Sequence, residues 1–291
     1  MKRILAILTL CLVLTLALTS CGENGKDGKD GLTPTIEISD DGYWVINGQK
    51  TNVKADGGNG EGAENPHGLD FYLNDDGTYA VAIGNAKYLS EIVIPETYLG
   101  KAVTEIAYNG FQGAQNLKSI TIPDSVTNIG SYAFQSCDSL TSVVIPDSVT
   151  YIGDSAFESC SLLTSMVIGD SVTSIGDYAF FNCDGLTSVV IPDSVTTIGD
   201  AAFESCSSLT SVVIPDSVIT IGYAAFRGCS SLTSVVISDG VTTIGEHAFY
   251  WCDSLKDVYY TGSEEEWKAI IGSSDYYLTI ATIHYNYVPE E

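Results

Sequence analysis

A solenoid of stacked repeats, α+β or all-β in class, is the architecture that this sequence indicates. One pattern of 23 residues recurs six times between Leu117 and Ser254, and the unit from Leu186 to Ser208 is typical. A fixed period of this length characterises small units that stack and share one core. One unit buries too little apolar surface to offset the entropy lost on ordering it, so only the capped stack is expected to fold. Three residue types recur without a slip in the period: Leu117, Leu140, Leu163, Leu186, Leu209, Leu232 and Leu255; Phe134, Phe157, Phe180, Phe203, Phe226 and Phe249; Cys137, Cys160, Cys183, Cys206, Cys229 and Cys252.

Each unit predicts one β-strand followed by a turn and a return segment. In the typical unit, Val189 and Ile191 alternate with more polar neighbours, so both are expected to face the core. Pro192 begins the turn, and Gly199 allows a second turn that larger residues would resist. The return residues expected in the core are Val195, Ile198, Ala202, Phe203 and Cys206.

Residues 1–20 predict a lipoprotein signal peptide. Lys2 and Arg3 precede an apolar run from Ile4 to Leu18, which is too short to be an ordinary membrane span. The segment then ends Leu-Thr-Ser-Cys at Cys21, which resembles a bacterial lipobox. That resemblance implies that Cys21 is lipidated and becomes the mature N-terminus. The protein is therefore expected to be exported and anchored to the bacterial membrane at the cell surface.

Three short segments follow the anchor. Residues 21–34 are polar and glycine-rich, which predicts a flexible spacer. Residues 35–54 alternate in polarity and carry turn signals at Asp41-Gly42 and Asn47-Gly48, which predicts a small β-hairpin or meander. Residues 55–68 are Gly-rich and acidic, and they predict a linker.

Residues 69–291 form the predicted solenoid, with regular repeats over 117–254 and atypical units at both ends. Phe71 to Ile83 predicts a hairpin that turns at Asp76-Gly77, and the first repeat carries five extra residues between Pro95 and Phe111. At the far end, Ser263 and Glu266 have the spacing of a helix capping box. A strand over 278–287 is expected to complete this cap.

The repeat resembles the BspA-like leucine-rich repeats of bacterial surface proteins. The shared pattern is Leu-x-x-(Val/Ile)-x-Ile-Pro-x-x-Val-x-x-Ile-Gly-x-x-Ala-Phe-x-x-Cys, and it covers roughly Leu69 to Tyr287. Gly169 and Ser238 replace the proline in two repeats. The resemblance implies a right-handed leucine-rich-repeat solenoid with a parallel sheet on its inner face. It also implies binding or adhesion to host or matrix proteins.

Charge and composition weigh against several classes of function. The chain has 37 acidic and 12 basic residues, and Arg227 is the one base between Ser119 and Leu255. We therefore do not expect a nucleic-acid partner, because a protein that binds nucleic acid clusters Lys and Arg side chains to neutralise the phosphates. The three histidines, His67, His247 and His284, are scattered along the chain, and no phosphate-binding loop occurs. We expect a monomer that is not an enzyme and has no cofactor.

Two columns of equivalent residues could mimic functional sites. Parallel stacking keeps Cβ vectors from converging, so the cysteine column predicts buried free thiols rather than disulfides or a zinc site. The aspartates that follow the repeat proline suit turn capping. A calcium site along this column is the alternative left open. These aspartates are Asp124, Asp147, Asp170, Asp193, Asp216 and Asp239.

Variable positions give the candidate binding surface. The outward strand positions are a monotonous row of Ser and Val, whereas aromatic residues, the single Arg and a His gather late in the stack. Tyr, Trp and Arg are the residue types that carry most interfaces. We expect an extracellular protein ligand; a glycan, or a structural role with no specific ligand, are the alternatives. The candidate patch is Tyr223, Arg227, His247, Tyr250 and Trp251.

Overall fold

The computed structural model describes residues 36–38, 43–46, 49–54, 68–271 and 276–288, in two compact units divided at Gly58. In the first unit, β1 (Ile36–Ile38), β2 (Tyr43–Ile46) and β3 (Gln49–Lys54) form an antiparallel sheet in that order. A bulge interrupts the β2–β3 pairing between Tyr43 and Val45. The predicted signal peptide, Cys21, the spacer and nearly all of the linker lie outside the described residues.

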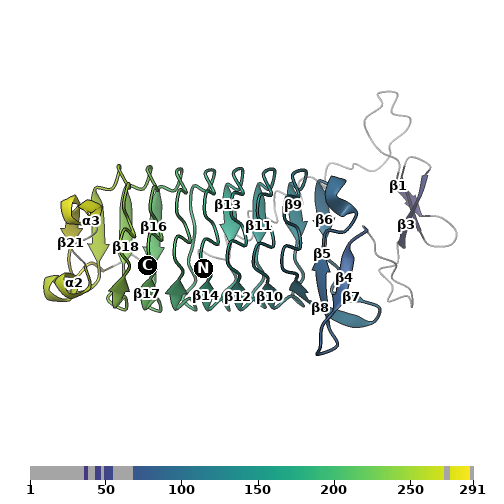
Figure 1. The fold of residues 1–291 in the computed structure, drawn as a ribbon, viewed down its shortest axis with the longest axis horizontal. Coiled ribbons are helices and arrows are strands. Elements are labelled where there is room, and N and C mark those ends of the chain that lie inside the picture. The colour runs from purple at the N-terminus through teal and green to yellow at the C-terminus, as the bar shows by residue number, and fades with distance from the viewer. Residues whose placement is uncertain (1–35, 39–42, 47–48, 55–67, 272–275, 289–291) are drawn as a thin grey trace, which may run out of the picture. The chain divides into compact units, whose positions relative to one another are not determined.

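The second unit is a β-solenoid whose turns lie side by side along one axis (Figure 1). Equivalent residues pair 23 positions apart in parallel, as with Ser142 and Ser165. This confirms the predicted solenoid, its 23-residue period and its parallel sheet. The strands at the predicted position are β6 (Glu91–Val93), β9 (Ser119–Thr121), β11 (Ser142–Val144), β13 (Ser165–Val167), β16 (Ser211–Ile214), β18 (Ser234–Ile237) and β20 (Asp257–Tyr260).

Each repeat also contributes a second strand, which the sequence prediction missed. The return segment pairs with the equivalent segments of the neighbouring turns. Their backbone N–H and C=O groups lie side by side, and buried backbone groups require hydrogen-bond partners. The resulting sheet has ten strands and is longer than any of the three separate sheets that contain the predicted strands. Its repeat strands are β8 (Lys101–Ile106), β10 (Asn128–Ile129), β12 (Tyr151–Ile152), β14 (Ser174–Ile175), β15 (Thr197–Ile198), β17 (Thr220–Ile221) and β19 (Thr243–Ile244).

Two hairpins and a 3-10 turn close the N-terminal end. Antiparallel strands β4 (Asp70–Leu73) and β5 (Tyr79–Ala82) confirm the predicted hairpin, and Gly77 lies in its turn with φ +85°. η1 (Ala86–Tyr88) follows. The extra residues of the first repeat form a second hairpin, in which β7 (Thr97–Tyr98) pairs with β8. Its turn residues, Leu99 and Gly100, both have positive φ, as tight hairpins require.

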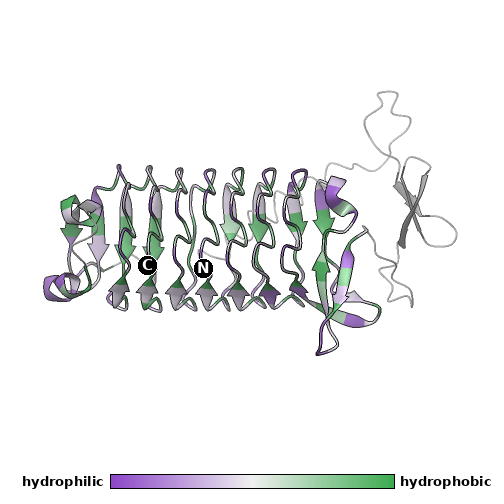
Figure 2. Cartoon of the chain, viewed as in Figure 1, coloured by the Kyte–Doolittle hydropathy of each residue, from purple (hydrophilic) through white to green (hydrophobic). Residues whose placement is uncertain are grey.

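Two helices and a strand close the C-terminal end. α2 (Glu264–Ile270) begins with the predicted capping box of Ser263 and Glu266. The predicted strand over 278–287 is wrong at its start, because α3 (Tyr276–Ile280) carries Leu278 as a fully buried residue against the core. Only β21 (Thr282–His284) is a strand, paired parallel to β20. Figure 2 shows α2 as a mainly hydrophilic element.

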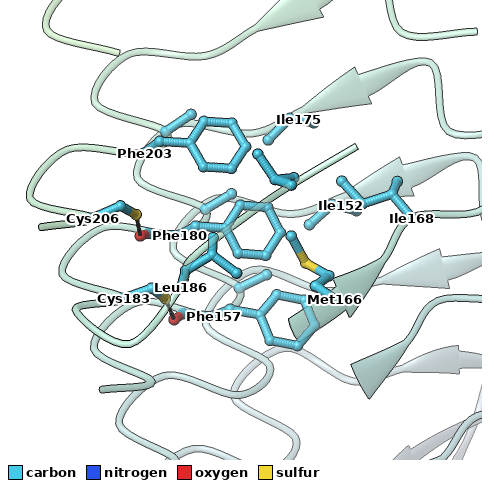
Figure 3. Close-up of a cluster of buried hydrophobic side chains, with 14 of the residues drawn as sticks. Ile152, Phe157, Met166, Ile168, Ile175, Phe180, Cys183, Leu186, Phe203 and Cys206 are labelled. Atoms are coloured by element: carbon cyan, nitrogen blue, oxygen red, sulfur yellow. Dashed lines mark hydrogen bonds between the residues drawn. The ribbon is translucent and has the colours of Figure 1, made fainter. Parts of the chain in front are cut away.

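One column of phenylalanines forms the centre of the solenoid. From Phe111 to Phe249 the rings stack with centroid separations of 5.0–5.4 Å, and every ring is fully buried. Figure 3 shows Phe157, Phe180 and Phe203 in this stack, with Leu186 beside them. The rings face each other because each repeat places the same side chain one turn further along the axis.

Candidate functional site

The cysteine column is structural. All six cysteines from Cys137 to Cys252 are buried and none is in a disulfide, as predicted. Each Sγ donates a hydrogen bond to the carbonyl of the phenylalanine 26 residues earlier, at 3.1–3.3 Å. Two of these bonds, from Cys183 to Phe157 and from Cys206 to Phe180, appear in Figure 3. Each of these carbonyls also accepts from the backbone amide three residues later, so the thiol adds a second hydrogen bond to it.

Members of two aspartate columns accept hydrogen bonds from the backbone. Asp147 accepts a hydrogen bond from the Asp170 amide at 2.9 Å. A second column does the same: the carboxylates of Asp154, Asp177 and Asp200 accept from the equivalent amide one turn later, at 2.7–3.0 Å. Within the described ranges no three His, Cys, Asp or Glu side chains converge on a metal-sized site.

The structure brings the five residues of the candidate patch together at the late repeats. His247 contacts Tyr223 edge-to-face, with ring centroids 5.8 Å apart, and Tyr250 at 5.1 Å. Tyr250 continues the row to Trp251, also at 5.1 Å. The Arg227 guanidinium lies 4.5 Å from the centre of the Trp251 ring, which is a cation–π contact. Tyr223 and Trp251 remain 45% and 50% exposed.

Two further residues belong to this surface. Glu204 forms an ion pair with Arg227 at 3.3 Å, and burial raises the pKa of its carboxyl although Arg227 opposes the shift. Glu204 lies 23 residues before Arg227, at the equivalent position of the preceding repeat, so this contact could have been predicted from the repeat alignment. Tyr277 meets Tyr250 edge-to-face at 5.7 Å and donates a hydrogen bond to Asp253 at 2.8 Å. Because Tyr277 lies in the irregular cap, no sequence signal could have found it.

Trp251 lies in a strained backbone conformation, and a second column of positive φ holds Tyr132, Tyr178 and His247 in the same way. The Trp251 position adopts the left-handed region in every repeat, and Trp251 has φ +62°. A bulky residue in this conformation is a genuine outlier, because its Cβ crowds the backbone. The other members of the column are small or readily adopt this conformation: Ser136, Ser159, Asn182, Ser205 and Gly228.

Two polar atoms in the patch are also unsatisfied. Nδ1 of His247 and Nε of Arg227 are buried and have no hydrogen-bond partner among the described residues. Buried polar groups are nearly always paired, so each such atom costs stability. The candidate patch therefore combines strained backbone with unsatisfied buried atoms, a combination that is common at functional sites.

Replacing Trp251 with Asn is expected to leave the free energy of unfolding within about 0.5 kcal/mol of the wild-type value. Asn182 stands at the equivalent position three repeats earlier, and Asn adopts the left-handed conformation more readily than Trp. Relief of the strained backbone, worth about 1 kcal/mol, offsets the lost cation–π contact of similar size. Urea unfolding would check this. A loss of more than about 2 kcal/mol would instead make Trp251 a packing residue of the C-terminal cap.

A second exposed surface runs along the predicted strands. Val144, Val167, Val190 and Val213 are 45–65% exposed and form one apolar row. Five successive repeats carry Val at this position, and β-branched residues are favoured in strands for local reasons. Nothing in this row distinguishes one ligand from another.

The comparisons with known proteins agree with this architecture. The BspA type Leucine rich repeat region matches in six copies, over residues 82–210 and 154–271. A search of the curated proteins found no match. Within the described part of the chain, no helix is both long and apolar enough to cross a bilayer.

Three solved structures are similar to this chain, and each is a leucine-rich repeat protein. The protein from Bacteroides ovatus is 33% identical over 66% of this chain and 53% of its own, with a TM-score of 0.59. The T. pallidum protein is 31% identical over 66% and 78%, with a TM-score of 0.51. The Eubacterium ventriosum protein is 27% identical over 66% and 51%, with a TM-score of 0.55. The match thus spans about half the length of the first and third of these proteins.

The six matching copies, the regular 23-residue register and the solenoid fold therefore place this chain in the family of BspA-type leucine-rich repeat proteins.

Proposed function

We propose that this chain is a lipid-anchored protein of the bacterial surface that recognises an extracellular protein through the patch around Trp251. One observation carries the proposal: an exposed aromatic row, with an arginine on the tryptophan, is held in a strained backbone conformation. Aromatic residues and arginine dominate the energetics of protein interfaces. The repeats around the patch supply a rigid scaffold, which keeps the entropic cost of binding low.

A pull-down tests the proposed recognition of a protein. The bait is residues 22–291, which omit only the predicted leader and the lipidated cysteine, and the prey are purified extracellular-matrix and host-surface proteins. A glycan array is run in parallel, because tyrosine and tryptophan rings also stack on sugars. Binding on the glycan array alone would favour the glycan alternative. Silence in both assays would favour a structural role.

Alanine at Tyr250 or at Trp251 is expected to weaken binding to a captured protein by more than about 1 kcal/mol, or at least fivefold in affinity. The physical reason is the loss of a ring that an interface would bury further; Trp251 is 50% exposed and Tyr250 is partly exposed. Tyr178→Ala is the matched control, because Tyr178 is a similarly exposed tyrosine, 45%, three repeats earlier. Calorimetry would measure both. Equal affinities for the patch variants and the wild type would remove this surface from the interface.

Cys21→Ser is expected to release the protein from the membrane fraction, because serine cannot form the thioether that carries the lipid. Fractionation followed by immunoblotting would measure this. Serine at Cys11, inside the predicted leader, is the control and should leave the distribution unchanged. Retention of the Cys21 variant in the membrane would contradict the lipid anchor without affecting the binding surface.

A further inference from the structure

A trough lies on the outer face of the N-terminal hairpin, at the other end of the solenoid from Trp251. On β4, β5 and β8 the residues Phe71, Val81 and Ile106 pack toward the core. Alternation along the strands therefore places the intervening residues outward. Tyr72 stands opposite Ala80 across β4 and β5, and Ala80 stands opposite Glu105 across β5 and β8.

Small residues on the middle strand make this face concave. Ala80 and Ala82 form the floor, and Ala80 is only 6% exposed although it faces outward. The walls are Tyr72 on one side and Tyr108 on the other, which are 54% and 65% exposed. The hollow between them has a volume of about 580 Å³. This volume suits a side chain together with its flanking backbone.

A second hollow continues the first. It has a volume of about 620 Å³ and shares Asn74 and Glu105 with its neighbour. Leu73, which is 58% exposed, adds an apolar contact, and Asn128 adds an amide group. We call the two hollows together the N-terminal trough. Their continuity suits an extended ligand rather than a compact one.

The charge of the N-terminal trough is negative throughout. Its lining includes the carboxylates of Asp70, Asp75, Asp76 and Glu105 and no Lys or Arg. Asp76 accepts hydrogen bonds from the amide and the hydroxyl of Thr78, which lower the pKa of its carboxyl. Among the described residues, no side chain forms an ion pair with Asp70 or Glu105. These carboxylates are therefore available to a ligand.

We propose that the N-terminal trough binds an extended basic peptide segment of a partner protein. A lysine or arginine side chain would lie with its aliphatic stem on the alanine floor and its charge between the two tyrosine rings, close to Asp70 and Glu105. The amides of Asn109 and Asn128 can bond the peptide backbone. This site shares no residue with the patch around Trp251, so either can fail without the other.

Titration calorimetry with residues 22–291 tests the site. The probe is a blocked glycine peptide carrying three spaced Lys and Arg residues, at about 100 mM salt to limit diffuse attraction. Asp70→Asn with Glu105→Gln is expected to weaken binding about tenfold or more. Tyr72→Ala with Tyr108→Ala is expected to weaken it about fivefold, although the charge is unchanged. The matched control, Asp124→Asn with Asp138→Asn, removes two exposed carboxylates elsewhere and should stay within about twofold.

Several results would overturn the proposal. No binding of the peptide, an equal loss in the Asp124/Asp138 control, or no loss in the tyrosine variant would each show that the trough is not a specific site. Spermine serves as a second probe. If it binds as tightly as the peptide and responds to the same variants, the trough takes a simple polycation and the peptide assignment is wrong. Thermal unfolding of each variant verifies the fold; if a double variant fails to fold, Glu105→Gln alone replaces the charge variant and Tyr72→Ala alone replaces the tyrosine variant.

Discussion

Alanine at Phe180 is expected to lower the free energy of unfolding by about 3–5 kcal/mol, because the change opens a cavity in a dry, close-packed column. The ring is fully buried and stacks on Phe157 at 5.3 Å and on Phe203 at 5.2 Å. Repeats that contact only their neighbours cannot compensate for a defect in the middle of the stack. Urea unfolding followed by circular dichroism would measure the loss.

Phe181→Ala is the matched control for this variant, because Phe181 is adjacent to Phe180 and has the same type of side chain. It is only half-buried and contacts Tyr178 edge-to-face at 5.8 Å. Alanine there is expected to cost less than about 1 kcal/mol. Similar losses at both positions would mean that the stacked column is not what holds the repeats together.

Raising the pH from 9 to 12 is expected to unfold the protein through its cysteine column. Burial raises the pKa of Cys183 and of Cys229 from 9.0 to about 12, and that of Cys206 well above 9.0. Below pH 9 these thiols are protonated in both states, so stability is fully present. Above pH 9 only the unfolded thiols lose protons, so each thiol removes about 1.4 kcal/mol of stability per pH unit until its folded pKa is passed.

Urea unfolding at a series of pH values would measure this slope, with the ultraviolet absorbance of thiolate as an independent readout. A variant with alanine at Cys183 and Cys229 is the control: it is less stable at neutral pH but should show a shallower alkaline slope. Native thiols that titrate near pH 9 would contradict the buried column.

Periodicity predicted most of the core because the same side chain meets its own copy at every turn. Phe180, Cys183 and Leu186 could be placed in the interior from their spacing alone, and the structure buries all three. The thiol hydrogen bonds to the phenylalanine carbonyls were not predicted, since they join residues 26 positions apart across neighbouring turns. The second strand of each repeat was missed for a similar reason. Two residues such as Thr197 and Ile198 show no alternation of their own, and they become a strand only by pairing with their copies.

The candidate patch was identified by setting aside the positions that repeat, and only part of its geometry could be inferred from the sequence. The residues that break the repeat identified Arg227, Tyr250 and Trp251, but the cation–π contact and the unsatisfied atoms required the packed side chains. The left-handed conformation at Trp251 was readable in principle, because its column otherwise holds Ser, Asn and Gly. The N-terminal trough was not readable, since it depends on which residues of three different strands stand opposite one another.

The sequence by itself determined the family, the period and the interior of this protein, because a stacked repeat converts spacing along the chain directly into contacts along the axis. The tertiary structure alone decided how the elements at the two ends meet the stack. There the repeat stops, and an irregular hairpin at one end and a helix carrying Tyr277 at the other meet the stack through contacts that no period specifies. The surfaces proposed to bind partners lie at these ends, where packing in the repeated core fixes the identity of fewer residues.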